Sequence, residues 1–312
     1  MKTKLIALLL FVCVSVLAQN KKDFIQKDIA VSPFIDGTIL TPETSGKSPL
    51  VIIIAGSGPT DRDGNQQMMK NNSLKYLAEA LYQEGIATFR YDKRIVKQMK
   101  ERNVNEESIR FDDFIKDASD VVAFFARSNA FSKIYVLGHS QGATVGLVAA
   151  QENVDGYISL AGPGRSIDEV IVEQLSKQAP GLTSNARAAF DELRTNGSTQ
   201  NYSPGLSSIF RPSLQPFIRS WMQYNPSEEI KKLDMPVLIL AGDKDLQVLP
   251  SEGEVLSEAK PDATYTVIPN MNHILKEIKE GDDDLVNQKS YNEPKRPVMP
   301  ELIAAITQFI KQ

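Results

Sequence analysis

The pentapeptide Gly138-His139-Ser140-Gln141-Gly142 has the pattern in which proteins present a nucleophilic serine. An apolar run at 134–137 precedes it and a small-residue run at 143–150 follows it, which predicts a strand, a sharp turn and a helix. A glycine on each side allows a tight turn, because glycine has no Cβ to clash. The serine hydroxyl would then project from the top of a sheet at a helix N-terminus. We therefore predict a nucleophile here, the alternative being a purely structural turn.

A serine hydroxyl is a weak nucleophile at neutral pH and needs a base within hydrogen-bonding reach. The sequence holds only two histidines, His139 and His273. His139 directly precedes the serine and, on such a turn, would point away from the serine side chain. His273 follows a predicted strand, at the edge where parallel sheets build their sites. We therefore predict that His273 is the base, the alternative being a surface histidine.

A third group must fix the tautomer of the histidine and stabilise its protonated form. Two aspartates, Asp243 and Asp245, follow the predicted strand at 237–241. We predict Asp245 as this acid, because the additional residues carry it past the end of the strand toward the histidine loop. Asp243 is expected to hydrogen-bond within its own turn.

The negative charge that develops on an attacked carbonyl oxygen needs two backbone N–H donors, an oxyanion hole. One predicted donor is Gln141, the residue after the serine. The other should come from the Gly-rich loop at 56–64, which follows the apolar run 50–55. We predict Ser57 as this donor, with Gly58 as the second choice.

Runs of strand length alternate with amphipathic runs of helix length along most of the chain. The predicted strands are 34–40, 50–55, 86–91, 134–137, 156–161, 237–241 and 264–268, and the predicted helices are 73–85, 112–127, 143–150 and a last one from Pro300. Residues 19–32 are either a tail or a first edge strand. This alternation predicts the α/β class, with a mostly parallel, doubly wound sheet. It breaks at about 163–233, where we expect a helical insertion that caps the sheet.

The first residues have the composition of a secretory signal peptide. Lys2 and Lys4 precede an apolar run, 5–18, which is shorter than a membrane-spanning helix needs. We therefore expect residues 1–18 to be removed and residues 19–312 to form one domain, the alternative being that residues 1–18 are a membrane anchor. The only cysteine, Cys13, lies in this run, so the mature chain would be secreted or periplasmic without disulfides.

The remaining composition argues against several kinds of partner. The net charge is −4 and no cluster of Lys and Arg stands out, so the sequence lacks the signature of a nucleic-acid-binding protein. No later apolar run is long enough to span a membrane, so we expect no stable membrane insertion after signal cleavage.

The order Ser140, Asp245, His273 is that of α/β-hydrolases. More narrowly, the chain resembles bacterial secreted carboxylesterases and related serine aminopeptidase-like hydrolases from about residue 34 onward. The shared motifs are the G-S-G-P-T-D-R-D loop at 56–63, R-Y-D-K-R at 90–94, the pentapeptide at 138–142, G-D-K-D at 242–245 and the late histidine. The chain has Ile95 where such families usually have glycine, and Gln141 where relatives often have glutamate. We expect Asp61, Arg62, Asp63 and Arg94 to form a structural ion network that shapes the oxyanion loop, the alternative being a catalytic role for these residues.

Together, the residues and the resemblance predict an α/β-hydrolase fold and a serine hydrolase that cleaves a small-molecule carboxylic ester through an acyl-enzyme. No metal or organic cofactor is expected. Cleavage of an amide, a peptide or a thioester uses the same groups, so these substrates stay open. An alternative of another class is a catalytically silent α/β-hydrolase fold used for binding. That alternative predicts a missing member of the Ser-His-Asp set, and the sequence supplies all three.

Overall fold

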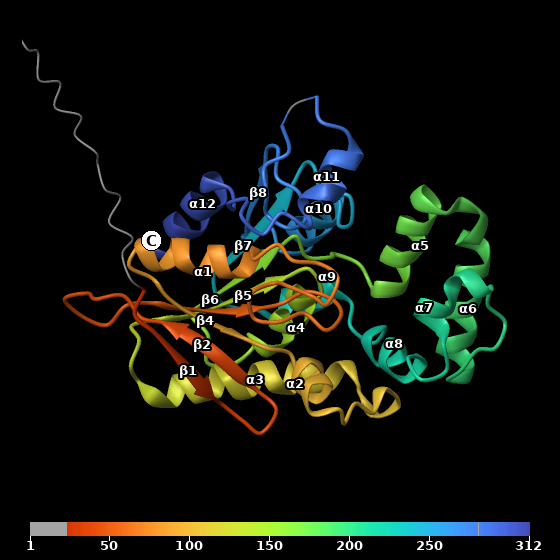
Figure 1. Cartoon of the computed structure of the whole chain (residues 1–312), viewed down its shortest axis with the longest axis horizontal. Helices are drawn as coiled ribbons and strands as arrows, with labels where there is room; N and C mark the ends of the chain where they lie inside the picture. The colour runs from red at the N-terminus through yellow and green to blue at the C-terminus, as the bar shows by residue number, and fades with distance from the viewer. Residues whose placement is uncertain (1–23, 280) are drawn as a thin grey trace, which may run out of the picture.

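A single eight-stranded sheet organises the computed structural model, which describes residues 24–279 and 281–312 (Figure 1). The strands are β1 (Gln26–Ala30), β2 (Asp36–Leu40), β3 (Leu50–Ile54), β4 (Ala87–Tyr91), β5 (Ile134–His139), β6 (Gly156–Leu160), β7 (Val237–Gly242) and β8 (Thr264–Ile268). The predicted signal peptide lies outside the described residues. Within the described part of the chain, no helix is both long and apolar enough to cross a membrane.

The strands lie in the order β1-β2-β4-β3-β5-β6-β7-β8. The hairpin of β1 and β2 is antiparallel and joins the sheet by an antiparallel pairing of β2 with β4, while every later pairing is parallel. The mostly parallel α/β sheet is therefore confirmed, and residues 26–30 form the edge strand that was one of the two expectations for this region. The strand β3 is buried at all five residues, as a continuous apolar run predicts for a strand covered on both faces.

Helices cover both faces of this sheet (Figure 1). On one face, α1 (Ser73–Gln83) and α12 (Pro300–Ile310) pack their apolar sides onto the sheet and contact each other. On the other face, α3 (Phe111–Ser128) and α4 (Gln141–Ala149) do the same. Burial of these two apolar layers supplies the main favourable free energy of folding.

The chain changes direction across the sheet between β3 and β5. From β3 it runs outward to β4, then returns to the opposite side of β3 to form β5. Ligands of open α/β sheets bind outside the carboxyl ends of strands at such a switch point. Because Ile54 of β3 pairs with Gly138 of β5, the predicted oxyanion loop and the predicted nucleophile turn leave the sheet side by side.

Helices occupy the stretch between β6 and β7; Figure 1 shows the first four of them grouped at one end of the molecule, while the last returns to the sheet beside α4. They are α5 (Ile167–Gln178), α6 (Thr183–Asn196), α7 (Ser207–Phe210), α8 (Gln215–Trp221) and α9 (Pro226–Glu229), with 3-10 turns at Pro180–Leu182, Pro204–Leu206 and Ile230–Lys232. Its buried residues Phe217 and Trp221 pack against α3, where Trp221 stacks on Phe111 with ring centroids 5.2 Å apart. We refer to residues 163–233 as the helical segment.

Three helices and one short turn were not predicted from the sequence. They are α2 (Arg94–Glu101), α10 (Pro250–Ala259), α11 (Asp284–Ser290) and the 3-10 turn Glu106–Ser108. The side chain of Asp283 accepts a hydrogen bond from the N–H of Val286 and so caps the N-terminus of α11. This cap was the one helix signal in a polar stretch without apolar periodicity. Ile95 lies in the first turn of α2, so the position where relatives usually have glycine is helical here.

Candidate active site

Ser140 lies on the tight turn between β5 and α4, with the strained backbone angles φ 55° and ψ −124°. A non-glycine residue with positive φ costs free energy and persists only where its surroundings hold it. The neighbouring glycines allow the backbone to pack closely: a Cβ on Gly138 would lie 2.2 Å from the carbonyl oxygen of Gly142. A Cβ on Gly142 would lie 2.4 Å from the carbonyl oxygen of Ile54. The two glycines are therefore required by close backbone contact, as the motif predicts.

The structure brings the three predicted residues into one hydrogen-bonded chain. The Nε2 atom of His273 lies 3.0 Å from the Oγ atom of Ser140, and its Nδ1 atom lies 2.7 Å from Oδ2 of Asp245. All three side chains are buried, with exposed fractions of 8% or less. A carboxylate can only accept a hydrogen bond from Nδ1–H, which leaves Nε2 free to receive the serine proton. The arrangement can therefore remove a proton from Ser140.

The loops that carry Asp245 and His273 are held against each other by backbone contacts. Lys244 donates its N–H to the carbonyl oxygen of Met271, 3.0 Å away, and a Cβ on Gly242 would lie 2.1 Å from that same oxygen. The other carboxylate oxygen of Asp245, Oδ1, accepts from the N–H groups of Gln247 and Val248. The carboxylate is thus fixed by its own loop while it holds the histidine.

The prediction for Asp243 was wrong in its detail. Its Oδ1 atom accepts from the N–H of Asn270 at 2.6 Å, so it bonds to the turn after β8 and not within its own turn. The reason is the close approach of the two loops, which brings Asn270 nearer than residues of the same turn. Asp243 therefore also supports the loop on which His273 lies.

His139 has a role that the sequence did not predict. Its Nε2 atom lies 2.7 Å from the carbonyl oxygen of His273, and the two imidazole rings have centroids 4.9 Å apart. A carbonyl oxygen only accepts, so Nε2 of His139 is the protonated nitrogen. Burial and the neighbouring His273 lower the pKa of His139 to about 4, which keeps the ring neutral. His139 therefore ties the turn that carries the serine to the loop that carries the base.

The predicted oxyanion donors lie on the two loops that meet beside Ser140. Gln141 is the first residue of α4, where backbone N–H groups have no acceptor within the helix. Ser57 lines both cavities that reach Ser140. Its carbonyl oxygen accepts from Thr60 Oγ1 at 2.7 Å and from Gln66 Nε2 at 2.9 Å, which fixes the loop. Gly58, the second choice, has φ 76° and forms the turn of this loop.

Of the four residues predicted to form an ion network around the oxyanion loop, Arg62 and Asp63 form ion pairs there. Arg62 forms a bidentate pair with Asp92 and reaches Asp28, while Asp63 pairs with Arg90. The carboxylate of Asp61 instead accepts hydrogen bonds from the N–H groups of Asp63 and Asn65. Arg94 belongs to a separate pairing with the α3 residues Asp113 and Asp117. The pairs of Arg62 and Asp63 anchor the loop to β1 and to the end of β4.

Lys93 is the most informative residue that sequence reasoning missed. Its buried Nζ atom donates to the carbonyl oxygen of Gly56 at 2.9 Å and to Oε1 of Gln141 at 2.6 Å, and lies 4.5 Å from the centroid of the Phe114 ring. The Gly56 carbonyl belongs to the same peptide unit as the N–H of Ser57. A hydrogen bond to that oxygen polarises the unit and strengthens its N–H as a donor. Lys93 thus contacts both residues of the predicted oxyanion hole.

Replacing Lys93 with methionine is expected to lower kcat by about 10²-fold and to change KM little. Loss of one oxyanion donor costs on the order of 10²-fold or more, and this change loosens both residues that supply the donors. Steady-state kinetics on a simple ester measures the effect, with Lys97→Met in the next turn as a matched control, because Lys97 pairs with Asp36 away from the site. Equal losses in the two variants would contradict this role.

The same lysine gives a prediction for stability against pH. Burial lowers the pKa of Lys93 to about 7 from its ordinary 10.5, so between these values the unfolded chain binds one proton more than the folded chain. Stability that depends on this group therefore rises with pH through that window, by up to about 1.4 kcal/mol for each pH unit. The free energies of unfolding of wild type and Lys93→Met are measured with denaturant at pH 7, 8 and 9. As the pH rises, the free energy of unfolding of wild type should increase relative to that of Lys93→Met. A difference that stays constant with pH would contradict burial of a titrating amine.

The hydroxyl of Ser140 faces a cavity of about 310 Å³. The helical segment supplies most of its wall, and the apolar lining residues include Pro163, Ile167, Ile171, Leu175, Ile209 and Trp221. The predicted insertion thus contributes side chains next to the serine. Within the described residues, no group of three or more His, Cys, Asp or Glu side chains is placed to hold a metal ion.

Comparison with known proteins agrees with this geometry. A family model described as serine aminopeptidase, S33 (Hydrolase_4) matches residues 69–203, a stretch that includes Ser140 but ends before Asp245. Esterase EstD of Thermotoga maritima is 29% identical over 262 residues, which are 82% of this chain and 61% of EstD. The chain thus spans less than two thirds of the length of this curated relative.

Solved structures show the same fold at low identity. Est1E from Butyrivibrio proteoclasticus superposes with a TM-score of 0.56 at 18% identity, over 92% of this chain and 99% of Est1E. A dienelactone hydrolase from Anabaena variabilis gives a TM-score of 0.51 at 16% identity, over 92% and 94% of the two chains. The chain is therefore an α/β-hydrolase in fold. It has esterase-like relatives, as the resemblance in the sequence implied.

Proposed function

We propose that this protein is a serine hydrolase that cleaves carboxylic esters through an acyl-enzyme. The observation that carries the proposal is the buried chain of hydrogen bonds from Asp245 through His273 to Ser140. It ends on a strained turn at a cavity, which is the geometry that activates a serine as a nucleophile. The esterase EstD, which aligns with 82% of this chain, supports esters over other acyl compounds.

In the proposed reaction, Oγ of Ser140 attacks the ester carbonyl while its proton passes to Nε2 of His273. The N–H groups of Ser57 and Gln141 stabilise the oxyanion of the tetrahedral intermediate. When the intermediate collapses, the alcohol leaves with the proton from His273. Water, deprotonated by the same nitrogen, then attacks the acyl-enzyme and releases the acid, which returns Ser140 to its starting state.

A panel of substrates tests this proposal. Purified protein is assayed with p-nitrophenyl esters of increasing acyl length and with aminoacyl p-nitroanilides, beside the Ser140→Ala variant. We expect hydrolysis of the shorter esters, little hydrolysis of the anilides and none above background with Ser140→Ala. Because the apolar cavity beside Ser140 measures only about 310 Å³, activity should fall for long acyl chains. Cleavage of the anilides alone, or no cleavage of any ester, would overturn ester hydrolysis.

We further propose that the protein acts after export, as a secreted or periplasmic enzyme. The support is the basic start and the short apolar run of residues 1–18. N-terminal sequencing of the protein from the producing cells tests this, and a mature chain that begins at Gln19 is the expected result. A chain recovered with residue 1 intact would contradict it.

A further inference from the structure

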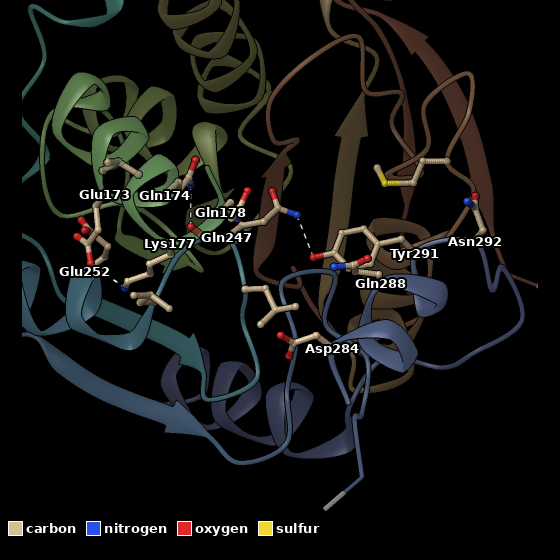
Figure 2. A pocket seen from close by; sticks show the side chains of 14 residues that line it. Glu173, Gln174, Lys177, Gln178, Gln247, Glu252, Asp284, Gln288, Tyr291 and Asn292 are labelled. Atoms are coloured by element: carbon tan, nitrogen blue, oxygen red, sulfur yellow. Dashed lines mark hydrogen bonds and ion pairs between the residues drawn. The ribbon is translucent and has the colours of Figure 1, made fainter. Parts of the chain in front are cut away.

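A second, larger cavity of about 860 Å³ adjoins the apolar one (Figure 2). It lies between α5 of the helical segment and the region of α11, with the loop after β7 between them. Figure 2 shows Gln174 and Gln178 on one side and Gln288 and Tyr291 on the other, with the side chain of Gln247 directed at Tyr291. The mechanism proposed above uses none of these side chains.

Amide side chains are the most numerous polar groups in the lining of this cavity. Five of its fourteen lining residues carry one: Gln174, Gln178, Gln247, Gln288 and Asn292. The acidic Glu173 and Glu252 are both paired with Arg165, and Glu173 also pairs with Lys177 at 2.9 Å. The remaining acid is Asp284, at the exposed first turn of α11. Much of the lining charge is thus paired within the protein. Gln174, Gln247 and Asn292 each use one amide atom in a hydrogen bond within the protein, so their other amide atoms and the amides of Gln178 and Gln288 are left to meet a ligand.

Gln247 joins this cavity to the site of the predicted chemistry. It lines the large cavity, the apolar cavity at Ser140 and a smaller one of about 90 Å³ beside His273. Its Nε2 atom donates to Oη of Tyr291 at 2.9 Å, and its carbonyl oxygen accepts from Gln174 Nε2 at 2.7 Å. Gln247 therefore lies where the three cavities meet, and the hydrogen bond from its backbone N–H to Asp245 holds it there.

We propose that the large cavity binds the alcohol part of the ester, and that this alcohol is polyhydroxylated, such as a sugar. The inference rests on the proposed ester hydrolysis. If the apolar acyl group occupies the 310 Å³ cavity, the alcohol part of the ester would extend past Gln247 into the large cavity. Each hydroxyl both donates and accepts, and an amide does the same, so several amides around one space suit a polyol.

Other alcohols fit this lining less well. A long alkyl alcohol would cover the amides without replacing their hydrogen bonds to water, which costs free energy for each group left unpaired. A strongly charged alcohol would find most counter-charges already engaged, because Glu173 and Glu252 pair with Arg165 and Lys177 pairs with Glu173. The remaining charged side chain, Asp284, is exposed to solvent, where a single ion pair contributes little. The inference therefore commits to a neutral, hydroxyl-rich leaving group.

Two esters with the same acyl group test this inference: 6-O-butyryl methyl glucoside and hexyl butyrate. For wild type we expect kcat/KM to be at least about tenfold higher for the sugar ester. The variants Gln178→Leu and Gln288→Leu, on opposite walls, should each lower kcat/KM for the sugar ester about fivefold to tenfold and leave hexyl butyrate within twofold. These effects correspond to loss of one neutral hydrogen bond. Gln223→Leu, an exposed glutamine outside the cavity lining, is the matched control and should change neither.

The outcomes separate the two proposals. If wild type cleaves both esters equally, or if the cavity variants lower both equally, the polyol inference is overturned while ester hydrolysis stands. If wild type cleaves neither these esters nor the p-nitrophenyl esters, both proposals are overturned. Selective loss of the sugar ester in both cavity variants, with normal hexyl butyrate hydrolysis, supports both.

Discussion

Replacing His273 with alanine is expected to lower kcat by on the order of 10⁶-fold. In the structure its Nε2 atom is 3.0 Å from Ser140 Oγ, so it is the group placed to take the serine proton. Without a base the serine stays a weak nucleophile, and removal of a member of such a unit costs nearly as much as removal of the whole unit. Single-turnover and steady-state kinetics on a p-nitrophenyl ester measure the loss.

The second histidine provides the comparison for this prediction. His139 is neutral, and it bonds to the backbone carbonyl of His273 and packs beside the His273 ring without reaching the reacting atoms. His139→Gln should therefore cost no more than about 10²-fold in kcat. The ratio between the two variants is the decisive quantity. If His139→Gln were the more damaging change, His273 could not be the base.

Replacing Asp245 with asparagine is expected to lower kcat by about 10⁴-fold. Its Oδ2 atom lies 2.7 Å from Nδ1 of His273, while its Oδ1 atom holds two backbone N–H groups. An amide there keeps the shape but favours the wrong histidine tautomer, and it removes the charge that stabilises the imidazolium. KM should change little, because the carboxylate acts through His273 and does not contact the substrate.

Asp243→Asn is the matched control, with the same chemical change two residues away. Asp243 accepts from the N–H of Asn270, and the oxygen of an asparagine can accept from that group as well. Its kcat should therefore stay within about tenfold of wild type, with circular dichroism showing that both variants are folded. Losses of similar size in the two variants would mean that the acid has been assigned to the wrong residue.

The sequence was sufficient to predict the sheet and the order of its strands along the chain. Continuous apolar runs such as 50–54 are typical of strands covered on both faces, and the elements between them have helical periodicity. The side chains at the carboxyl ends of these strands then had to lie at one edge. This is why Ser140, Asp245 and His273, far apart in sequence, were predicted together and are hydrogen-bonded in the structure.

The features that sequence reasoning missed depend on tertiary contact and not on local pattern. A lysine in a polar loop is normally expected to be exposed to solvent. Only the fold places the amine of Lys93 between Gly56 and Gln141. The helix α11 lies in a polar stretch with little apolar periodicity, so its place opposite α5 was not predictable. The large cavity is lined by residues of both α5 and α11, so its amide lining forms only when the fold brings these two helices together.

Covalent labelling of Ser140 tests the central claim most directly. Wild-type protein and Ser140→Ala are treated with a fluorophosphonate, digested and analysed by mass spectrometry. The account predicts one adduct in wild type, on the peptide that contains Ser140, and no adduct in the variant. Labelling of Ser140→Ala to the wild-type extent, or an adduct on another residue such as Ser57, would contradict the assignment of Ser140 as the nucleophile.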